Sequence, residues 1–129
     1  MNNIDIKFNS EIKLVIIGGG PAGLAAALEA NRNGIEAKDI LIIERDNELG
    51  GILNQCIHTG FGLHIFGEEL SGPEYAGKFI KQIESAGIPY ITDSMVLDLN
   101  DERNISFVSP KTGFMRVNAG AVIIACGCR

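Results

Sequence analysis

The sequence has few cysteines, no long apolar run and no excess of positive charge, and each shortage excludes a class of protein. Its 129 residues include three cysteines, Cys56, Cys126 and Cys128, too few for a disulfide framework. No second cysteine pair or histidine cluster completes a zinc site, so we expect no bound metal. The formal net charge of −5 argues against nucleic acid and anionic membrane surfaces as partners.

The absence of long apolar segments also limits where such a protein works. No run reaches the length of a membrane-spanning helix, and no basic region followed by an apolar one opens the chain. With thiols that we take to be reduced, we expect a cytoplasmic protein. Apolar residues make up 46% of the chain and charged residues 21%, as in globular α/β proteins, and the length suits one domain.

Glycine, by contrast, is abundant, and its most informative cluster follows an apolar run. Residues 14–17 predict a strand buried on both faces, and an alanine-rich helix follows. Between them stand Gly18, Gly20 and Gly23, in the pattern G-x-G-x-x-G. The first glycine permits a tight turn, the second lets a phosphate approach the backbone, and the third allows close helix–strand packing. The pattern predicts a dinucleotide pyrophosphate at the helix N-terminus.

Two further features support this interpretation. Pro21 and Ala22 occupy the first helical turn, where the missing proline N–H costs nothing, and we expect both at the pyrophosphate. A second apolar run, Ile40–Ile43, ends in Glu44, about 20 residues past the last glycine, where a ribose-binding carboxylate is expected. The alternative is a strand, turn and helix without a ligand.

The residues after this second run help to choose the nucleotide. Glu44 and Arg45 are followed, after four residues, by Gly50 and Gly51. This spacing resembles the E-R-x4-G-G extension of flavoproteins that bind FAD and a second dinucleotide. FAD lies extended, so a second glycine turn can approach its pyrophosphate from the far side. The alternative is a plain loop after a solvated strand end.

The rest of the chain predicts a parallel sheet with a helical and a strand excursion. Residues 52–67 predict a short helix and an irregular loop, and 74–86 an amphipathic helix with a Glu74–Lys78 pair, ended by Gly87. Strands are predicted over residues 90–92, 95–99, 105–108, 114–117 and 121–125, the last fully buried. We therefore expect an α/β, Rossmann-like FAD/NAD(P)-binding fold whose crossover is a β-meander.

Together these motifs resemble the N-terminal FAD-binding segment of the pyridine nucleotide-disulfide oxidoreductase superfamily. The residues Ala125, Cys126 and Gly127 are similar to the family's A-T-G segment, with cysteine in place of threonine. The resemblance implies that their backbone contacts the flavin nucleotide, and that the backbone of Val96 contacts adenine.

More narrowly, residues 50–58, residues 72–76 and the final Cys-Gly-Cys-Arg are similar to one subgroup. It includes subunits of hydrogen cyanide synthase, opine oxidase and amino-acid dehydrogenases, and flavoproteins that accompany glycerol-3-phosphate dehydrogenase. The resemblance covers about the first third of such a protein. It implies that residues 1–129 are a truncated FAD-binding domain, without the NAD(P)-binding domain and the second FAD contact.

The resemblance also bears on the chemistry. Disulfide reductases of this superfamily carry C-x4-C after the paired glycines, but here Gly51 and Phe61 flank Cys56 at the partner positions. We therefore expect no dithiol mechanism, and bound FAD carries the redox chemistry. By the resemblance Gln55 and Cys56 lie near the flavin ring, with His58.

Catalytic residues are otherwise unknown, and His58 and Cys56 are the candidates. A histidine such as His58 could move a proton, although a packed or surface histidine and a small buried cysteine are the simpler interpretations. The partners would be a small organic substrate or a redox subunit, with NAD(P) bound elsewhere. The rival functions are an NAD-binding dehydrogenase domain and a non-catalytic nucleotide-binding subunit.

Overall fold

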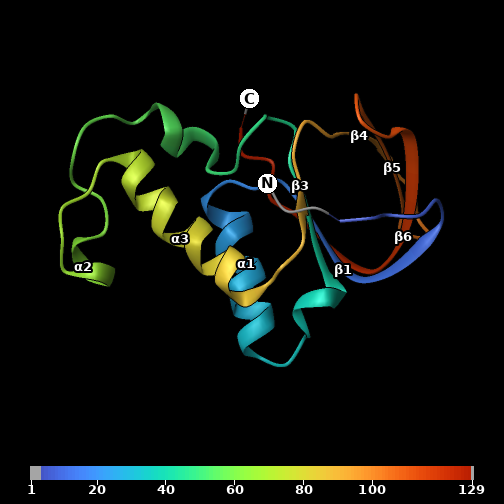
Figure 1. The fold of residues 1–129 in the computed structure, drawn as a ribbon, viewed down its shortest axis with the longest axis horizontal. Coiled ribbons are helices and arrows are strands. Elements are labelled where there is room, and N and C mark those ends of the chain that lie inside the picture. Colours follow the sequence, from blue (N-terminus) through green and yellow to red (C-terminus); the bar gives the residue numbers. More distant parts are fainter. Residues whose placement is uncertain (1–3, 129) are drawn as a thin grey trace.

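The computed structural model describes residues 4–128, and in it a six-stranded sheet lies against two helices (Figure 1). Residues 1–3 and Arg129, which ends the Cys-Gly-Cys-Arg segment, lie outside the described part. The elements in chain order are β1 (Ser10–Ile17), α1 (Pro21–Arg32), the 3-10 helix η1 (Ala37–Asp39), β2 (Ile40–Ile43), the 3-10 helix η2 (Gly51–Gln55), α2 (Leu63–Phe66), α3 (Gly72–Ala86), β3 (Tyr90–Ile91), β4 (Met95–Leu99), β5 (Asn104–Ser109) and β6 (Gly113–Ile124).

The sheet has the strand order β3-β2-β1-β6-β5-β4. Strands β3, β2, β1 and β6 are parallel, whereas β4, β5 and the first half of β6 form an antiparallel meander. Helices α1 and α3 cover one face of the parallel strands, and Figure 1 shows the meander curling away from that helical side. The expected Rossmann-like fold with a β-meander crossover is confirmed.

The two apolar runs owe their continuity to this layering. Leu14 and Ile16 of β1 pack into the core under the helices, together with Leu24 of α1. Val15, between them, points to the opposite face and packs with Phe107 of the meander. Successive side chains of a strand alternate between faces, so a strand covered on both sides carries no polar residue. Each such buried side chain contributes about 1.5–3 kcal/mol of hydrophobic stabilisation.

The prediction of a separate, fully buried strand over residues 121–125 is wrong. Strand β6 runs without a break from Gly113 to Ile124, and its last residues are open: Ile123 is 37% exposed and Ile124 is 67% exposed. Beyond Asn118 the strand pairs with β1 alone, because the meander has turned away and β5 no longer borders it.

Helix α3 begins two residues earlier than the apolar spacing indicates, because a capping box fixes its first turn. The Ser71 hydroxyl accepts from the Glu74 N–H, and the Glu74 carboxylate accepts from the Ser71 N–H. These bonds to Ser71 lower the pKa of Glu74 below its ordinary value. The expected Glu74–Lys78 ion pair is not formed, because Lys78 reaches back to Glu68, with its Nζ 3.4 Å from the carboxylate.

The excursion between η2 and α3 is more ordered than an irregular loop. It contains the short helix α2 and closes on itself where Phe61 pairs with Leu70. Ring contacts hold it against α3: Phe61 stacks on Tyr75 with centroids 5.9 Å apart, and Phe66 meets Phe79 at 5.6 Å. Figure 1 shows this excursion projecting beyond the end of α3 that is distant from the meander.

Tyr90 gives the fold a pH dependence that can be measured. Its hydroxyl donates to Glu84 at 2.9 Å, and burial, followed by this hydrogen bond and the Glu84 charge, raises the pKa of Tyr90 to about 12. The folded chain therefore holds the phenol proton more tightly than the unfolded chain, whose tyrosine has a pKa of about 10. The resulting stabilisation is complete below pH 10 and is lost as the pH rises towards 12.

We therefore expect Tyr90→Phe to flatten this loss. Between about pH 10 and pH 12 the wild-type free energy of unfolding should fall by about 2 kcal/mol more than that of the variant. Urea unfolding of both proteins at intervals from pH 8 to pH 12 measures the difference. Parallel curves for the two proteins would show that Tyr90 ionises alike in both states.

Candidate functional site

The turn between β1 and α1 is built so that only glycine fits at two of its positions. Gly18 has φ +108°, and a Cβ on it would lie 2.2 Å from the carbonyl oxygen of Ala125. A Cβ on Gly23 would lie 2.0 Å from the carbonyl oxygen of Gly18. The Gly18 N–H donates to the Ile43 carbonyl at 2.9 Å, which ties the turn to β2. The first and third glycines thus have the structural roles that the pattern predicts.

The second glycine pair lies directly against the first turn. The Gly50 N–H donates to the Gly19 carbonyl at 2.8 Å, and a Cβ on Gly51 would approach the Gly20 Cα to 2.9 Å. Both paired glycines have positive φ, +120° and +57°. Two stretches of bare backbone, 31 residues apart in sequence, therefore meet without side chains between them.

The N-terminus of α1 faces this junction, and no side chain among residues 4–128 caps it with a hydrogen bond. Gly20 is the N-cap residue and makes no side-chain cap hydrogen bond, Pro21 opens the helix, and the first turn holds no acidic residue. Pro21 and Ala22 are exposed. The first N–H groups of the helix and the positive end of its dipole favour an anion at such a place.

Glu44 stands at the end of β2 and turns its carboxylate into the glycine turn. The side chain is buried, 6% exposed, and its Oε1 accepts from the Gly19 N–H at 2.8 Å. Its Oε2 accepts from the Asp46 N–H at 2.6 Å. A carboxylate has about four acceptor positions, so two backbone bonds fix its orientation and leave capacity for a further donor. Arg45, beside it, is exposed.

Two later segments complete the carboxyl edge of the sheet. The Ser94 N–H donates to the Glu44 carbonyl at 2.9 Å, which brings the start of β4, with the half-buried Val96, next to Glu44. At the end of β6, the Ala125 N–H donates to the Ile17 carbonyl at 2.8 Å, and the Cys126 thiol points to the same oxygen at 3.7 Å. Gly127 follows with φ +69°.

The three residues expected near a flavin ring lie at the other end of the glycine pair. Gln55 ends η2 and is exposed, and Cys56 is half-buried with its thiol directed to the Ile52 carbonyl at 3.4 Å. His58 is exposed, with Nδ1 3.1 Å from the Thr59 carbonyl oxygen and its ring 5.3 Å from Phe61. Here His58 is a surface histidine on the excursion.

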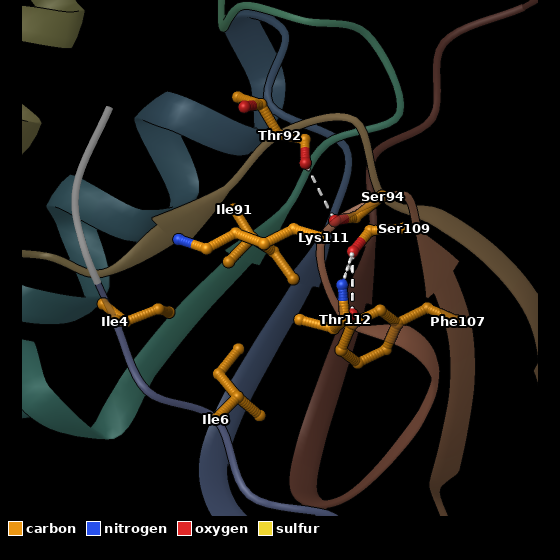
Figure 2. A pocket seen from close by; sticks show the side chains of 9 residues that line it. All are labelled: Ile4, Ile6, Ile91, Thr92, Ser94, Phe107, Ser109, Lys111 and Thr112. Atoms are coloured by element: carbon orange, nitrogen blue, oxygen red, sulfur yellow. Dashed lines mark hydrogen bonds between the residues drawn. The ribbon is translucent and has the colours of Figure 1, made fainter.

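Two hollows lie elsewhere and contain none of the glycines. One, of about 420 Å³, lies beside the loop before Gly50 and is bordered by Glu48, Asn54 and Tyr90. The other, of about 60 Å³, lies between the N-terminal segment and the meander, and Figure 2 shows Ile4, Ile6 and Phe107 around it. The second is far below the roughly 300–1,000 Å³ of small-molecule sites.

Three hydroxyl groups that line this second hollow are already paired. The Ser94 hydroxyl donates to the Thr92 carbonyl at 2.9 Å, and the hydroxyls of Ser109 and Thr112 are 2.7 Å apart, as the dashed lines in Figure 2 show. Among residues 4–128, no three His, Cys, Asp or Glu side chains gather as metal ligands. None of the helices in that range is both long and apolar enough to cross a bilayer.

The residues at the carboxyl edge fit an extended dinucleotide. The backbones of Gly20 and Gly51 touch at the N-terminus of a helix, where a Cβ on Gly51 would be crowded, and a fixed carboxylate lies beside them. The sequence motifs include all of these residues. They do not predict that Glu44 also braces the glycine turn. This contact arises because the parallel neighbours β1 and β2 end at the same edge of the sheet.

This edge defines a Rossmann-like nucleotide-binding domain, and comparisons with known proteins narrow the class. A family model described as FAD-dependent oxidoreductase matches residues 13–114. The acrylate reductase flavoprotein subunit of Shewanella woodyi is 47% identical over 55 residues, which are 43% of this chain and 10% of that protein. Thioredoxin reductase of Ureaplasma parvum is 35% identical over 88 residues, which are 67% of this chain and 26% of that protein.

Among solved structures, bacillithiol disulfide reductase of Bacillus cereus shares the fold. It has a TM-score of 0.73 and 22% identity, and the match covers 92% of this chain and 40% of that one. The chain belongs to the FAD-dependent oxidoreductase family. It is similar to the FAD-binding portion of such enzymes, for which FAD is the cofactor, and spans 10% and 26% of the two curated relatives.

Proposed function

We propose that this chain binds the ADP half of FAD along the carboxyl edge of β1, β2 and β6. The observation that carries the proposal is the side-chain-free contact between Gly20 and Gly51 at the N-terminus of α1. There the diphosphate would accept from the first N–H groups of the helix, while Pro21 and Ala22 flank it. Both glycine turns must lack side chains here, because the diphosphate would lie over the two touching backbones.

The remaining contacts follow from the same edge. Glu44, held by Gly19 and Asp46, would accept from the ribose hydroxyls, and its charge disfavours a 2′-phosphate. The backbone of Val96 would meet adenine. The last proposed group is the backbone of residues 125–127, where β6 ends beside Gly18.

When bound, the flavin supplies two-electron redox chemistry. The chain's own residues would orient the cofactor and exclude water from the diphosphate, and Gln55 would lie towards the ring. Because Cys56 has no cysteine partner at the C-x4-C spacing, no dithiol next to the paired glycines takes part in our proposal. Arg45, exposed beside Glu44, would lie at the adenosine.

For the longer protein we propose an oxidoreductase of a small organic substrate or of a partner redox subunit, linked to NAD(P) through a further domain. The resemblance to the subgroup that includes hydrogen cyanide synthase and opine oxidase subunits supports this proposal. We also propose that the protein is cytoplasmic. His58 and Cys56 remain the candidates for catalytic residues.

Nucleotide titration tests the proposal on the 129-residue chain. We expect FAD and ADP to bind with similar, micromolar dissociation constants and FMN not to bind, because all the proposed contacts except that of Gln55 go to the ADP half or the adjoining diphosphate. The chain alone should give little or no turnover. Calorimetry with FAD, ADP, FMN and NAD measures this.

The rival functions predict other results. An NAD-binding dehydrogenase domain would bind NAD more tightly than FAD, and binding of none of the four nucleotides would contradict the proposed site. The second glycine pair favours FAD, because its position against the first turn suits an extended dinucleotide approached from two sides.

A further inference from the structure

Two thiols that the proposed function does not use stand together at the end of β6. Cys126 and Cys128 are both exposed and are separated by Gly127 alone. Cys56, by contrast, is half-buried, with its thiol directed to a carbonyl of its own 3-10 helix. Cysteine reactivity follows exposure of the sulfur, so the pair is the reactive part of the thiol complement.

The backbone between the two cysteines permits them to be joined. Residues two apart span at most about 7 Å when the chain is fully extended. Gly127 has φ +69°, which bends the chain away from the extended form. Disulfides require a Cα separation of about 4.4–6.8 Å, so a pair limited to about 7 Å needs only a small bend at Gly127, which glycine permits.

We infer that Cys126 and Cys128 form a reversible dithiol–disulfide site whose oxidation loosens the nucleotide edge. A small organic disulfide is the oxidant. The thiolate of one cysteine attacks it and forms a mixed disulfide with release of one thiol. The second cysteine then attacks that mixed disulfide and releases the second thiol. Two electrons pass from the cysteine pair to the small disulfide, and the two protons of the cysteines end on the released thiols.

The structural consequence follows from what surrounds Cys126. Its thiol donates to the Ile17 carbonyl, and the Ala125 carbonyl oxygen packs against Gly18. A bond to Cys128 draws the sulfur away from Ile17 and constrains Gly127, so the segment leaves its position beside the first glycine turn. A disulfide in so small a ring is strained and exposed, and such disulfides are readily reduced again.

Oxidation by excess oxidised glutathione, followed by thiol counting and mass spectrometry, tests the site. We expect two of the three thiols to disappear with a mass loss of about 2 Da, one hydrogen per sulfur, and dithiothreitol to restore them. Cys56→Ser should still lose two thiols. Cys126→Ser and Cys128→Ser each leave one cysteine of the pair. That cysteine should either stay a free thiol or gain one glutathione. A glutathione adduct on the wild-type pair, or a disulfide-linked dimer on a non-reducing gel, would overturn the inference.

A titration with FAD tests the consequence, which rests on the proposed function. The oxidised chain should bind FAD about threefold or more weakly than the reduced chain, since the Cys126 contact and the ordered backbone beside it are lost. The double variant Cys126→Ser/Cys128→Ser, which has no thiol at this site, should bind FAD equally before and after treatment with the same oxidant. Equal affinities for the oxidised and reduced wild type would overturn the coupling. Failure of the reduced chain to bind FAD would instead contradict the proposed function, while the thiol count still decides the disulfide.

Discussion

Gly23→Ala should abolish FAD binding and lower the free energy of unfolding by about 3 kcal/mol or more. The added methyl group would lie 2.0 Å from the carbonyl oxygen of Gly18 and 3.4 Å from the Ile16 side chain. The first contact cannot relax easily, because it is with the backbone of the glycine turn, which the Gly18 N–H ties to β2. Helix α1 must move away from the turn, and the proposed diphosphate cradle opens. Urea unfolding followed by circular dichroism, with FAD titration of the folded variant, measures both effects.

Gly77→Ala is the matched control for this prediction. Gly77 also lies within a helix, α3, but it is exposed and a Cβ on it would meet nothing within 4 Å. Alanine favours a helix over glycine by about 1 kcal/mol, so this variant should be more stable and should bind FAD as the wild type does. If Gly23→Ala were as stable as the wild type or, like Gly77→Ala, more stable, the tight helix–strand approach at Gly23 would be refuted.

The position of the glycine turn can be predicted from the sequence alone. The glycine pattern is local: its spacing, the apolar run before it and the acid after it lie within 31 residues. The strands on either side of it are buried on both faces, so their sequences are uninterrupted and easy to recognise. The parallel core and the residues of the proposed nucleotide-binding edge could therefore be predicted without the structure.

The end of the chain was harder to predict, because one glycine has an unexpected role. The sequence predicts separate strands over residues 114–117 and 121–125, but Gly120, between them, lies inside the continuous strand β6. A Cβ there would lie 2.8 Å from the Lys13 carbonyl oxygen, so this glycine permits close passage of β6 along β1. Local sequence does not distinguish a turn glycine from one required by a neighbouring strand.

Long-range partners were likewise beyond local patterns. Lys78 stands four residues after Glu74, the usual spacing for a helical ion pair, yet the capping bonds to Ser71 already hold that carboxylate. Glu68 becomes available to Lys78 only because the excursion folds back onto α3. The same limit applies to Glu44, whose bonds to Gly19 and Asp46 appear only when two strands end side by side.

Because Glu44 has these bonds, its removal should affect stability as well as binding. Glu44→Ala leaves the Gly19 N–H and the Asp46 N–H without their acceptors at a buried position. We expect a loss of about 2–4 kcal/mol in the free energy of unfolding, since each bond is charge-assisted. The affinity for FAD and for ADP should fall by about tenfold or more, because the ribose loses its acceptor and the turn loses its brace.

Glu44→Gln separates the two roles of this side chain. The amide oxygen can keep one of the two backbone bonds, so the loss of stability should be smaller than for alanine, while the ribose still loses a charged acceptor. Glu48→Gln, an exposed change in the same loop, is the matched control and should leave stability and FAD affinity unchanged. Urea unfolding and calorimetric titration of the three variants give the comparison. If Glu44→Ala retained both wild-type stability and wild-type FAD affinity, then this carboxylate would neither brace the glycine turn nor contact the ribose, and the proposed binding edge would have to be moved.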